Sequence, residues 1–87
     1  MPIVFIPSLM RGLTRGLSRV EVAGRTVGEA IDSLELAYPG VRARLIDGDR
    51  LGAGIAVAVD GEIVVLGLAE RLGESSEVHF LPAIGGG

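Results

Sequence analysis

The sequence predicts an α+β fold in which one main helix packs on one face of a mixed sheet of four to five strands. Apolar residues after Thr26 recur at spacings of three and four, which is typical of a helix with a single apolar face. Runs rich in Val and Ile precede and follow this helix. An Asp-Gly pair at residues 60–61 joins two of these runs, and such a pair is a strong signal for a hairpin.

Length and composition indicate one small folded domain. The chain has 87 residues, of which 48% are hydrophobic and 22% charged, and its net charge of −3 argues against disorder. We expect residues 1–82 to form the domain and residues 83–87 to form a flexible C-terminal tail ending in Gly-Gly. Aromatic residues are scarce, so the core is expected to be aliphatic.

The N-terminal part is predicted to form two antiparallel strands. Residues 3–7 are mostly β-branched or aromatic and end at a proline, as expected for a first strand. Residues 8–16 contain two glycines and are expected to form a long hairpin connection. Residues 17–23 alternate between apolar and polar side chains with one break, which predicts the second strand.

Residues 26–38 form the predicted main helix. Thr26 and Glu29 match the capping-box pattern, in which a hydroxyl and a carboxylate three residues later accept hydrogen bonds from free backbone N–H groups. Pro39 and Gly40 end the helix. Its apolar stripe is one-sided, so the helix should lie across a sheet instead of being surrounded. The stripe comprises Val27, Ala30, Ile31, Leu34 and Ala37.

The second half of the chain is predicted to add three strands. Residues 55–60 and 62–66 form the two arms of the Asp-Gly hairpin, and residues 77–81 form the last strand. Pro82 is expected to stop the pairing of this strand. The shorter elements are one or two helical turns at residues 41–46, a turn at 47–50 and a single helical turn within 67–76.

Strand alternation predicts an apolar surface on the sheet face that the helix does not cover. If Val4, Ile6, Val78 and Phe80 point toward the helix, then Ile3, Phe5 and Leu81 point away from it, and Ile63 joins them. An uncovered apolar face close to the start of the tail is an interaction surface by default, so Phe5, Ile63 and Leu81 are candidate partner contacts. The alternative is that loops partly shield these side chains.

The sequence contains no recognisable enzyme site. The glycines within residues 52–54 precede a predicted strand instead of following one, so they do not form a dinucleotide-binding motif. The sequence lacks lysine and cysteine, which excludes a P-loop, a cysteine nucleophile and a Cys-based zinc site. His79 is the only histidine and lies in a predicted strand, where a structural or exposed role is more common than catalysis. Asp47 and Asp49 are better explained as turn residues than as metal ligands, so no metal site is expected.

Charge and hydropathy narrow the possible partners. An acidic chain with few aromatic residues argues against nucleic-acid binding. No apolar run approaches the roughly 20 residues that a membrane span needs, and no signal peptide is evident. We therefore expect a cytoplasmic protein that does not bind membranes.

The last residues of the chain offer one functional group, the α-carboxylate of Gly87. Residues 85–87 are all glycine and have no side chains, so this tail can enter a narrow cleft. From Pro82 to Gly87 its extended reach is roughly 20 Å. A carboxylate must be activated before it reacts, most simply as an acyl-adenylate formed from ATP. The alternative is a terminus without a function.

These features together resemble the ubiquitin-like β-grasp sulfur carriers. The resemblance rests on the ββαββ order, the capped helix, the Val-Asp-Gly-Glu hairpin and the ending Val-His-Phe-Leu-Pro-Ala-Ile-Gly-Gly-Gly. The family includes the small subunit of molybdopterin synthase, the thiamin-pathway carrier and the carrier for thiocarboxylate-dependent cysteine synthesis. The resemblance implies that an E1-like enzyme adenylates the terminal glycine with ATP and that a sulfur donor converts it to a thiocarboxylate. A molybdopterin synthase large subunit or a cysteine synthase then accepts the sulfur.

The resemblance also assigns residues by their position in the chain. Gly87 bears the adenylate and then the thiocarboxylate, and Gly86 completes the Gly-Gly pair. Leu81 occupies the apolar position before the proline that meets partners, and Ile84 and Gly85 belong to the partner-binding tail. The family usually has Ala or Thr where this sequence has Gly85, which loosens the tail but keeps its length.

The resemblance implies a carrier that is not itself an enzyme, although it can be counted as the small subunit of a molybdopterin synthase. No cofactor is expected to bind, and ATP is used by the activating enzyme. Two other interpretations remain open at this point. The chain can be a ubiquitin-like modifier that is conjugated to lysines through the same glycine, or a β-grasp binding module in which the tail has no role.

Overall fold

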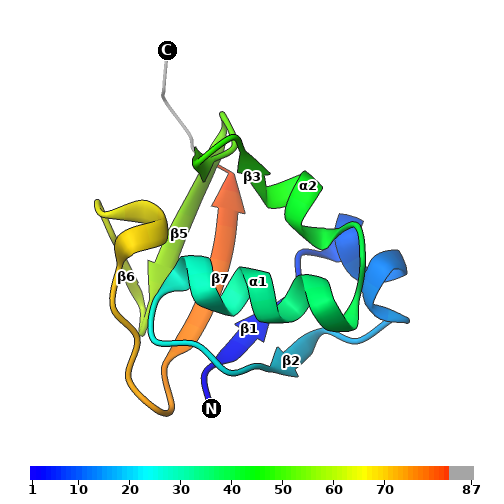
Figure 1. Cartoon of the computed structure of the whole chain (residues 1–87), viewed down its shortest axis with the longest axis horizontal. Coiled ribbons are helices and arrows are strands. Elements are labelled where there is room, and N and C mark those ends of the chain that lie inside the picture. Colours follow the sequence, from blue (N-terminus) through cyan, green and yellow to red (C-terminus); the bar gives the residue numbers. More distant parts are fainter. Residues whose placement is uncertain (83–87) are drawn as a thin grey trace.

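A mixed five-stranded sheet is crossed on one face by the helix α1 (Val27–Ala37), as Figure 1 shows. A computed structural model of the chain describes residues 1–82. The strand order is β2-β1-β7-β5-β6, in which β1 and β7 are parallel and the other neighbours are antiparallel. This architecture confirms the predicted α+β fold. The strands are β1 (Ile3–Phe5), β2 (Arg19–Glu21), β5 (Ile55–Val59), β6 (Glu62–Ile63) and β7 (Glu77–Pro82).

The N-terminus of α1 is capped as the sequence predicts. The Glu29 backbone N–H donates to the Thr26 hydroxyl at 3.1 Å, and the Glu29 carboxylate accepts from the Arg25 N–H at 2.9 Å. The carboxylate therefore closes the box one residue earlier than the standard pattern, in which it would bind the Thr26 N–H. The predicted stripe is fully buried at Val27, Ala30, Ile31 and Leu34, whereas its last member, Ala37, is exposed.

The first connection differs from the prediction. Residues 8–16 form the long connection that the sequence predicts, but most of it is a 3₁₀ helix, η1 (Ser8–Thr14), which the sequence does not predict. Met10 is 6% exposed and Thr14 is fully buried, with its hydroxyl 3.0 Å from the Leu17 carbonyl oxygen. The helix forms because this connection covers one end of the core. Gly12 and Gly16 are typical of loops, so the sequence did not indicate this role.

The second half contains the predicted elements with shorter strands. The helical turns at residues 41–46 form α2 (Val41–Leu45), and the turn at 47–50 lies within a small hairpin. The predicted single helical turn within residues 67–76 is the 3₁₀ helix η2 (Gly67–Ala69). The remaining hairpin strands are β3 (Ile46–Asp47) and β4 (Arg50–Leu51).

Three predicted strands are too long, and the first of them, residues 3–7, forms a strand only at Ile3–Phe5. Residues 17–23 form a strand only at Arg19–Glu21, and residues 62–66 only at Glu62–Ile63. Both β2 and β6 lie at edges of the sheet. An edge strand makes backbone hydrogen bonds to one neighbour only, so it ends where the two chains separate. After the hydrogen bond from the Val64 N–H to the Val57 carbonyl, the chain leaves the sheet and Val65 is 95% exposed.

The core lies between the sheet and the helices, and the predicted strand facing is correct. Val4, Ile6, Val78 and Phe80 are all buried against the helical side. Pro82 is a correction, because it was expected to stop pairing but instead pairs with Ile55 as the last residue of β7. A proline has no N–H to donate, so the end of a strand is a position where it fits. Within residues 1–82, none of the helices has the length and apolar character that a membrane span requires.

Candidate functional site

The sheet face opposite α1 carries an apolar row that crosses four strands. The pairing register aligns Ile63 with Ala58, Ala58 with His79, and His79 with Phe5. Because Ala58 is small, the larger side chains of Ile63 and His79 stand on either side of it. Ile63 is 60% exposed, whereas Phe5 is partly buried. Of the expected partner contacts, the structure thus brings Phe5 and Ile63 into one row.

Leu81 extends this row toward the end of β7. It pairs with Ala56 and is 39% exposed, on the same face as His79. We call Phe5, Ile63, His79 and Leu81 the open-face patch. Ile63 and Leu81 are exposed, so the alternative that loops shield them is wrong, and Phe5 is partly buried with the His79 ring stacked on it.

His79 is the member of the patch that sequence reasoning did not select. Its imidazole stacks on the Phe5 ring with centroids 4.1 Å apart and an interplanar angle of 10°. Its Nε2 lies 4.0 Å from the Glu77 carboxylate, and its side chain is 40% exposed. The alternation that places Leu81 on this face places His79 there as well, so the signal was present in the strand pattern. The stack holds the Phe5 ring in place and adds a polar edge to an otherwise apolar patch.

The predicted tail residues Ile84, Gly85, Gly86 and Gly87 lie outside the residues that the structure describes. The structure shows where the tail starts, because β7 ends at Pro82, next to Leu81. Five residues span at most roughly 17 Å, so a protein that holds Gly87 must approach this end of the sheet. The open-face patch therefore lies within reach of such a partner.

Residues 1–82 contain no group of three or more His, Asp or Glu side chains that could hold a metal ion. His79 has Glu77 as its acidic neighbour, but the 4.0 Å separation is long for a hydrogen bond. In the described part of the chain, the candidate site is thus a docking surface beside the start of the tail.

The fold, the docking surface and the glycine tail define a ubiquitin-like carrier, and comparison with known proteins identifies its family. Residues 9–87 match the ThiS family, so the chain belongs to this family of ubiquitin-like β-grasp sulfur carriers. The sulfur carrier protein CysO of Mycobacterium tuberculosis is 35% identical over 89 residues, covering 97% of this chain and 96% of the relative. The predicted resemblance is confirmed.

Solved structures agree with this assignment. A chain in the crystal structure of the Amycolatopsis orientalis BexX/CysO complex superimposes with a TM-score of 0.90 at 36% identity, with full coverage of both chains. Mycobacterium tuberculosis CysO gives 0.87 at 31% identity, covering 97% of this chain and 100% of that one. Haloferax volcanii SAMP1, a small archaeal modifier protein, gives 0.72 at 29% identity, covering 99% and 98%. The fold and the sulfur-carrier class thus rest on sequence and structure together.

Proposed function

We propose that the chain carries sulfur for cysteine biosynthesis as a thiocarboxylate on Gly87. The observation that carries the proposal is its similarity to CysO proteins over nearly the full length of both chains. This similarity favours cysteine biosynthesis over molybdopterin biosynthesis as the pathway. In either pathway the chain acts as a co-substrate, and the chemistry belongs to its partner enzymes.

The proposed cycle begins with activation of the terminal carboxylate. A carboxylate oxygen of Gly87 attacks the α-phosphorus of ATP on an E1-like enzyme, forming an acyl-adenylate and releasing pyrophosphate. Hydrosulfide released by a sulfur donor then attacks the acyl carbon, AMP leaves, and the thiocarboxylate forms. Glycine suits this step because the absence of a Cβ leaves the carbonyl unhindered. Because activation consumes ATP, the proposal places the carrier in the cytoplasm.

The second half of the cycle transfers the sulfur. The nucleophilic sulfur of the thiocarboxylate replaces a leaving group on an electrophilic carbon of the substrate of a cysteine synthase, which forms a thioester. Hydrolysis of the acyl C–S bond then leaves the sulfur on the product and regenerates the carboxylate. The role of residues 1–82 is to dock on each enzyme so that the tail enters its active site. The open-face patch supplies apolar contact area for docking beside the end of β7.

Mass spectrometry of the intact protein, purified from its own cells, tests the proposal. We expect a fraction whose mass is increased by the replacement of one oxygen with sulfur, and we expect this fraction to disappear when the sulfur donor is removed. Deletion of Gly86 and Gly87 should abolish adenylation by the activating enzyme. Normal adenylation of the deleted chain would contradict the proposal and favour a binding module with an unused tail.

A second candidate function is protein modification through the same glycine. The similarity to Haloferax volcanii SAMP1 favours it, although the identity and TM-score are lower than for the CysO structure of the Amycolatopsis complex. In the same mass-spectrometry experiment, modification predicts Gly87 joined to lysine ε-amines of other proteins. Such adducts without any thiocarboxylate would replace the sulfur-carrier proposal.

A further inference from the structure

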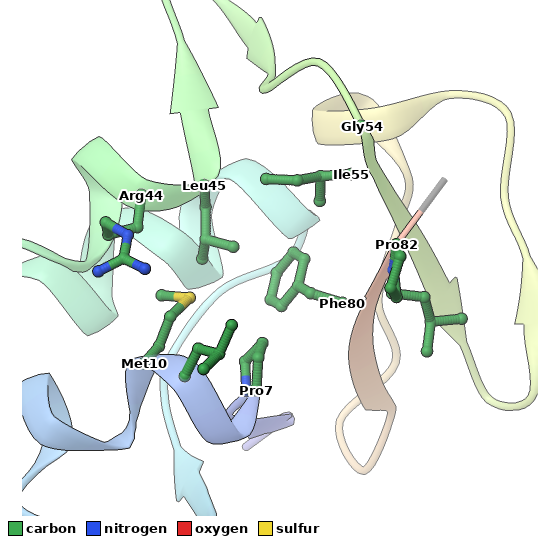
Figure 2. A pocket seen from close by; sticks show the side chains of 10 residues that line it. Pro7, Met10, Arg44, Leu45, Gly54, Ile55, Phe80 and Pro82 are labelled. Atoms are coloured by element: carbon green, nitrogen blue, oxygen red, sulfur yellow. The ribbon is translucent and has the colours of Figure 1, made fainter. Parts of the chain in front are cut away.

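A groove opens on the helical side of the sheet, at the end where β7 reaches Pro82. It has a volume of about 270 Å³ and lies between η1, α2 and the adjoining ends of β5 and β7. Figure 2 shows Phe80, Leu45 and Met10 pointing toward one another around it. Phe80 and Leu81 are consecutive and face opposite sides of β7, but Leu81 also lines the groove, so the groove adjoins the open-face patch at this residue.

The groove has an apolar interior and a basic rim. Pro7 and Ile55 add to the apolar lining, and Leu9 stands at its edge with 89% exposure. Arg44 supplies the positive charge. The neighbouring Arg42 pairs with Asp32 at 3.1 Å, whereas Arg44 has no ion pair or side-chain hydrogen bond within residues 1–82. Its charge is therefore available to an external carboxylate.

The size of the groove indicates the kind of occupant. Pockets that bury a drug-sized molecule have volumes of about 300–1,000 Å³, so a groove of about 270 Å³ is small for such a ligand. It suits one or two apolar side chains of a protein. An exposed leucine beside an apolar hollow, with an arginine that has no ion pair within residues 1–82, is also the composition expected of an interaction surface.

The position of the groove indicates which protein supplies those side chains. Pro82 lines the groove and is five residues before Gly87, so Gly87 and the protein that holds it lie within roughly 20 Å of this point. In the proposed cycle, the protein that first holds the free Gly87 carboxylate is the activating enzyme.

We infer that the groove receives an apolar side chain of the activating enzyme, with an adjacent carboxylate of that enzyme pairing with Arg44. The inference rests on the proposed function. The enzyme would then contact β7 from both faces, through the groove on one side and the open-face patch on the other. Such a two-sided contact adds binding area on both faces of the strand that leads into the tail.

The test measures ATP–pyrophosphate exchange by the cognate activating enzyme as a function of carrier concentration. Leu9→Asp removes the apolar rim, and Arg44→Glu reverses the charge. We expect each change to raise the KM for the carrier about tenfold with kcat nearly unchanged, because the lost contacts serve binding. Both residues are exposed, so circular dichroism should show an intact fold for each variant.

Matched controls separate the groove from general surface effects. Leu36→Asp makes the same chemical change as Leu9→Asp at an exposed leucine on α1, and Arg71→Glu makes the same charge reversal at an exposed arginine before β7. Neither residue lines the groove. Both controls should keep KM within about twofold of the unmodified chain. An arginine substituted for the pairing carboxylate of the enzyme should restore binding of Arg44→Glu.

Four results would overturn the inference. An unchanged KM for both groove variants, with the unmodified chain adenylated normally, rejects the groove contact and leaves the proposed function standing. No adenylation of the unmodified chain rejects the proposed function and this inference with it. A dimer that Leu9→Asp dissociates would show that a second copy fills the groove. Shifted NMR signals of Met10 and Phe80 after deletion of residues 83–87 would show that the chain's own tail fills it.

Discussion

At the scale of single residues, two neighbours in β7 have opposite roles. Phe80 faces α1 and is 8% exposed, whereas Leu81 faces the other side of the sheet and is 39% exposed. One side chain therefore contributes mainly to the free energy of unfolding, and the other is available to partners. Because adjacent strand residues face opposite ways, this difference follows from the register of β7.

Substitutions at these two positions should separate stability from binding. Phe80→Ala should lower the free energy of unfolding by about 3–5 kcal/mol, because it truncates a buried aromatic residue. Leu81→Glu should change it by less than about 1 kcal/mol but weaken binding to the partner enzymes. Urea denaturation and titration calorimetry would measure the two effects. Unfolding by Leu81→Glu, or a neutral Phe80→Ala, would mean that the facing of β7 is reversed.

At the scale of elements, the β5–β6 hairpin is fastened to the start of β7 by one carboxylate. Asp60 accepts from the Glu77 backbone N–H at 2.9 Å and from the Ser76 hydroxyl at 3.0 Å. Ser76 in turn accepts from the Gly73 N–H at 2.8 Å, so the side chain of a hairpin turn organises the loop that precedes β7. Asp60 also has a positive φ of 51°, which Asp tolerates better than most residues.

Asp60→Ala should therefore cost about 1–3 kcal/mol in the free energy of unfolding, because it removes both hydrogen bonds and leaves the nearly buried Ser76 hydroxyl with one partner fewer. Asp60→Asn is the matched control, since it tolerates positive φ and retains one acceptor oxygen. The free energy of unfolding of Asp60→Asn should fall by less than half as much as that of Asp60→Ala. Thermal unfolding followed by circular dichroism gives both values, and equal losses for the two variants would contradict this account.

At the scale of the whole molecule, the domain and the tail are predicted to be separable. The sheet and the core cluster that the structure describes are built from residues 1–82, and β7 pairs with β5 up to Pro82. A chain that ends after Pro82 should therefore have the same free energy of unfolding as the full chain, within about 0.5 kcal/mol. Urea denaturation measures both values. The shortened chain should not be adenylated. A large loss of stability would show that residues 83–87 belong to the folded domain.

Much of this arrangement could be predicted from local patterns in the chain. The spacing of Val27, Ile31 and Leu34 predicted which side of α1 is buried, and strand alternation placed Leu81 and Ile63 on the open face. The capping residues Thr26 and Glu29 predicted where the helix begins. These features depend on residues within one or two turns of each other, so periodicity reports them directly.

Other features depended on neighbours that are distant in the chain. The apolar run continues after Ile63 with Val64, Val65 and Leu66, which favours a longer strand. β6 nevertheless stops at Ile63, because an edge strand is held by hydrogen bonds to one neighbour only. η1 forms because Met10 and Thr14 are buried at one end of the core, next to α2, which the sequence does not indicate. The groove exists only because η1, α2 and the ends of β5 and β7 meet around Phe80.

The sequence by itself determined the secondary-structure order, the buried faces and the glycine tail, since each of these is a local property of the chain. Only the tertiary structure decided where the edge strands end, how His79 stacks on Phe5, and that a groove with Arg44 at its rim opens where β7 ends. The physical reason is that pairing and packing join residues far apart in the chain. The spacing of residues along the chain does not specify such long-range contacts, which arise only when the sheet forms.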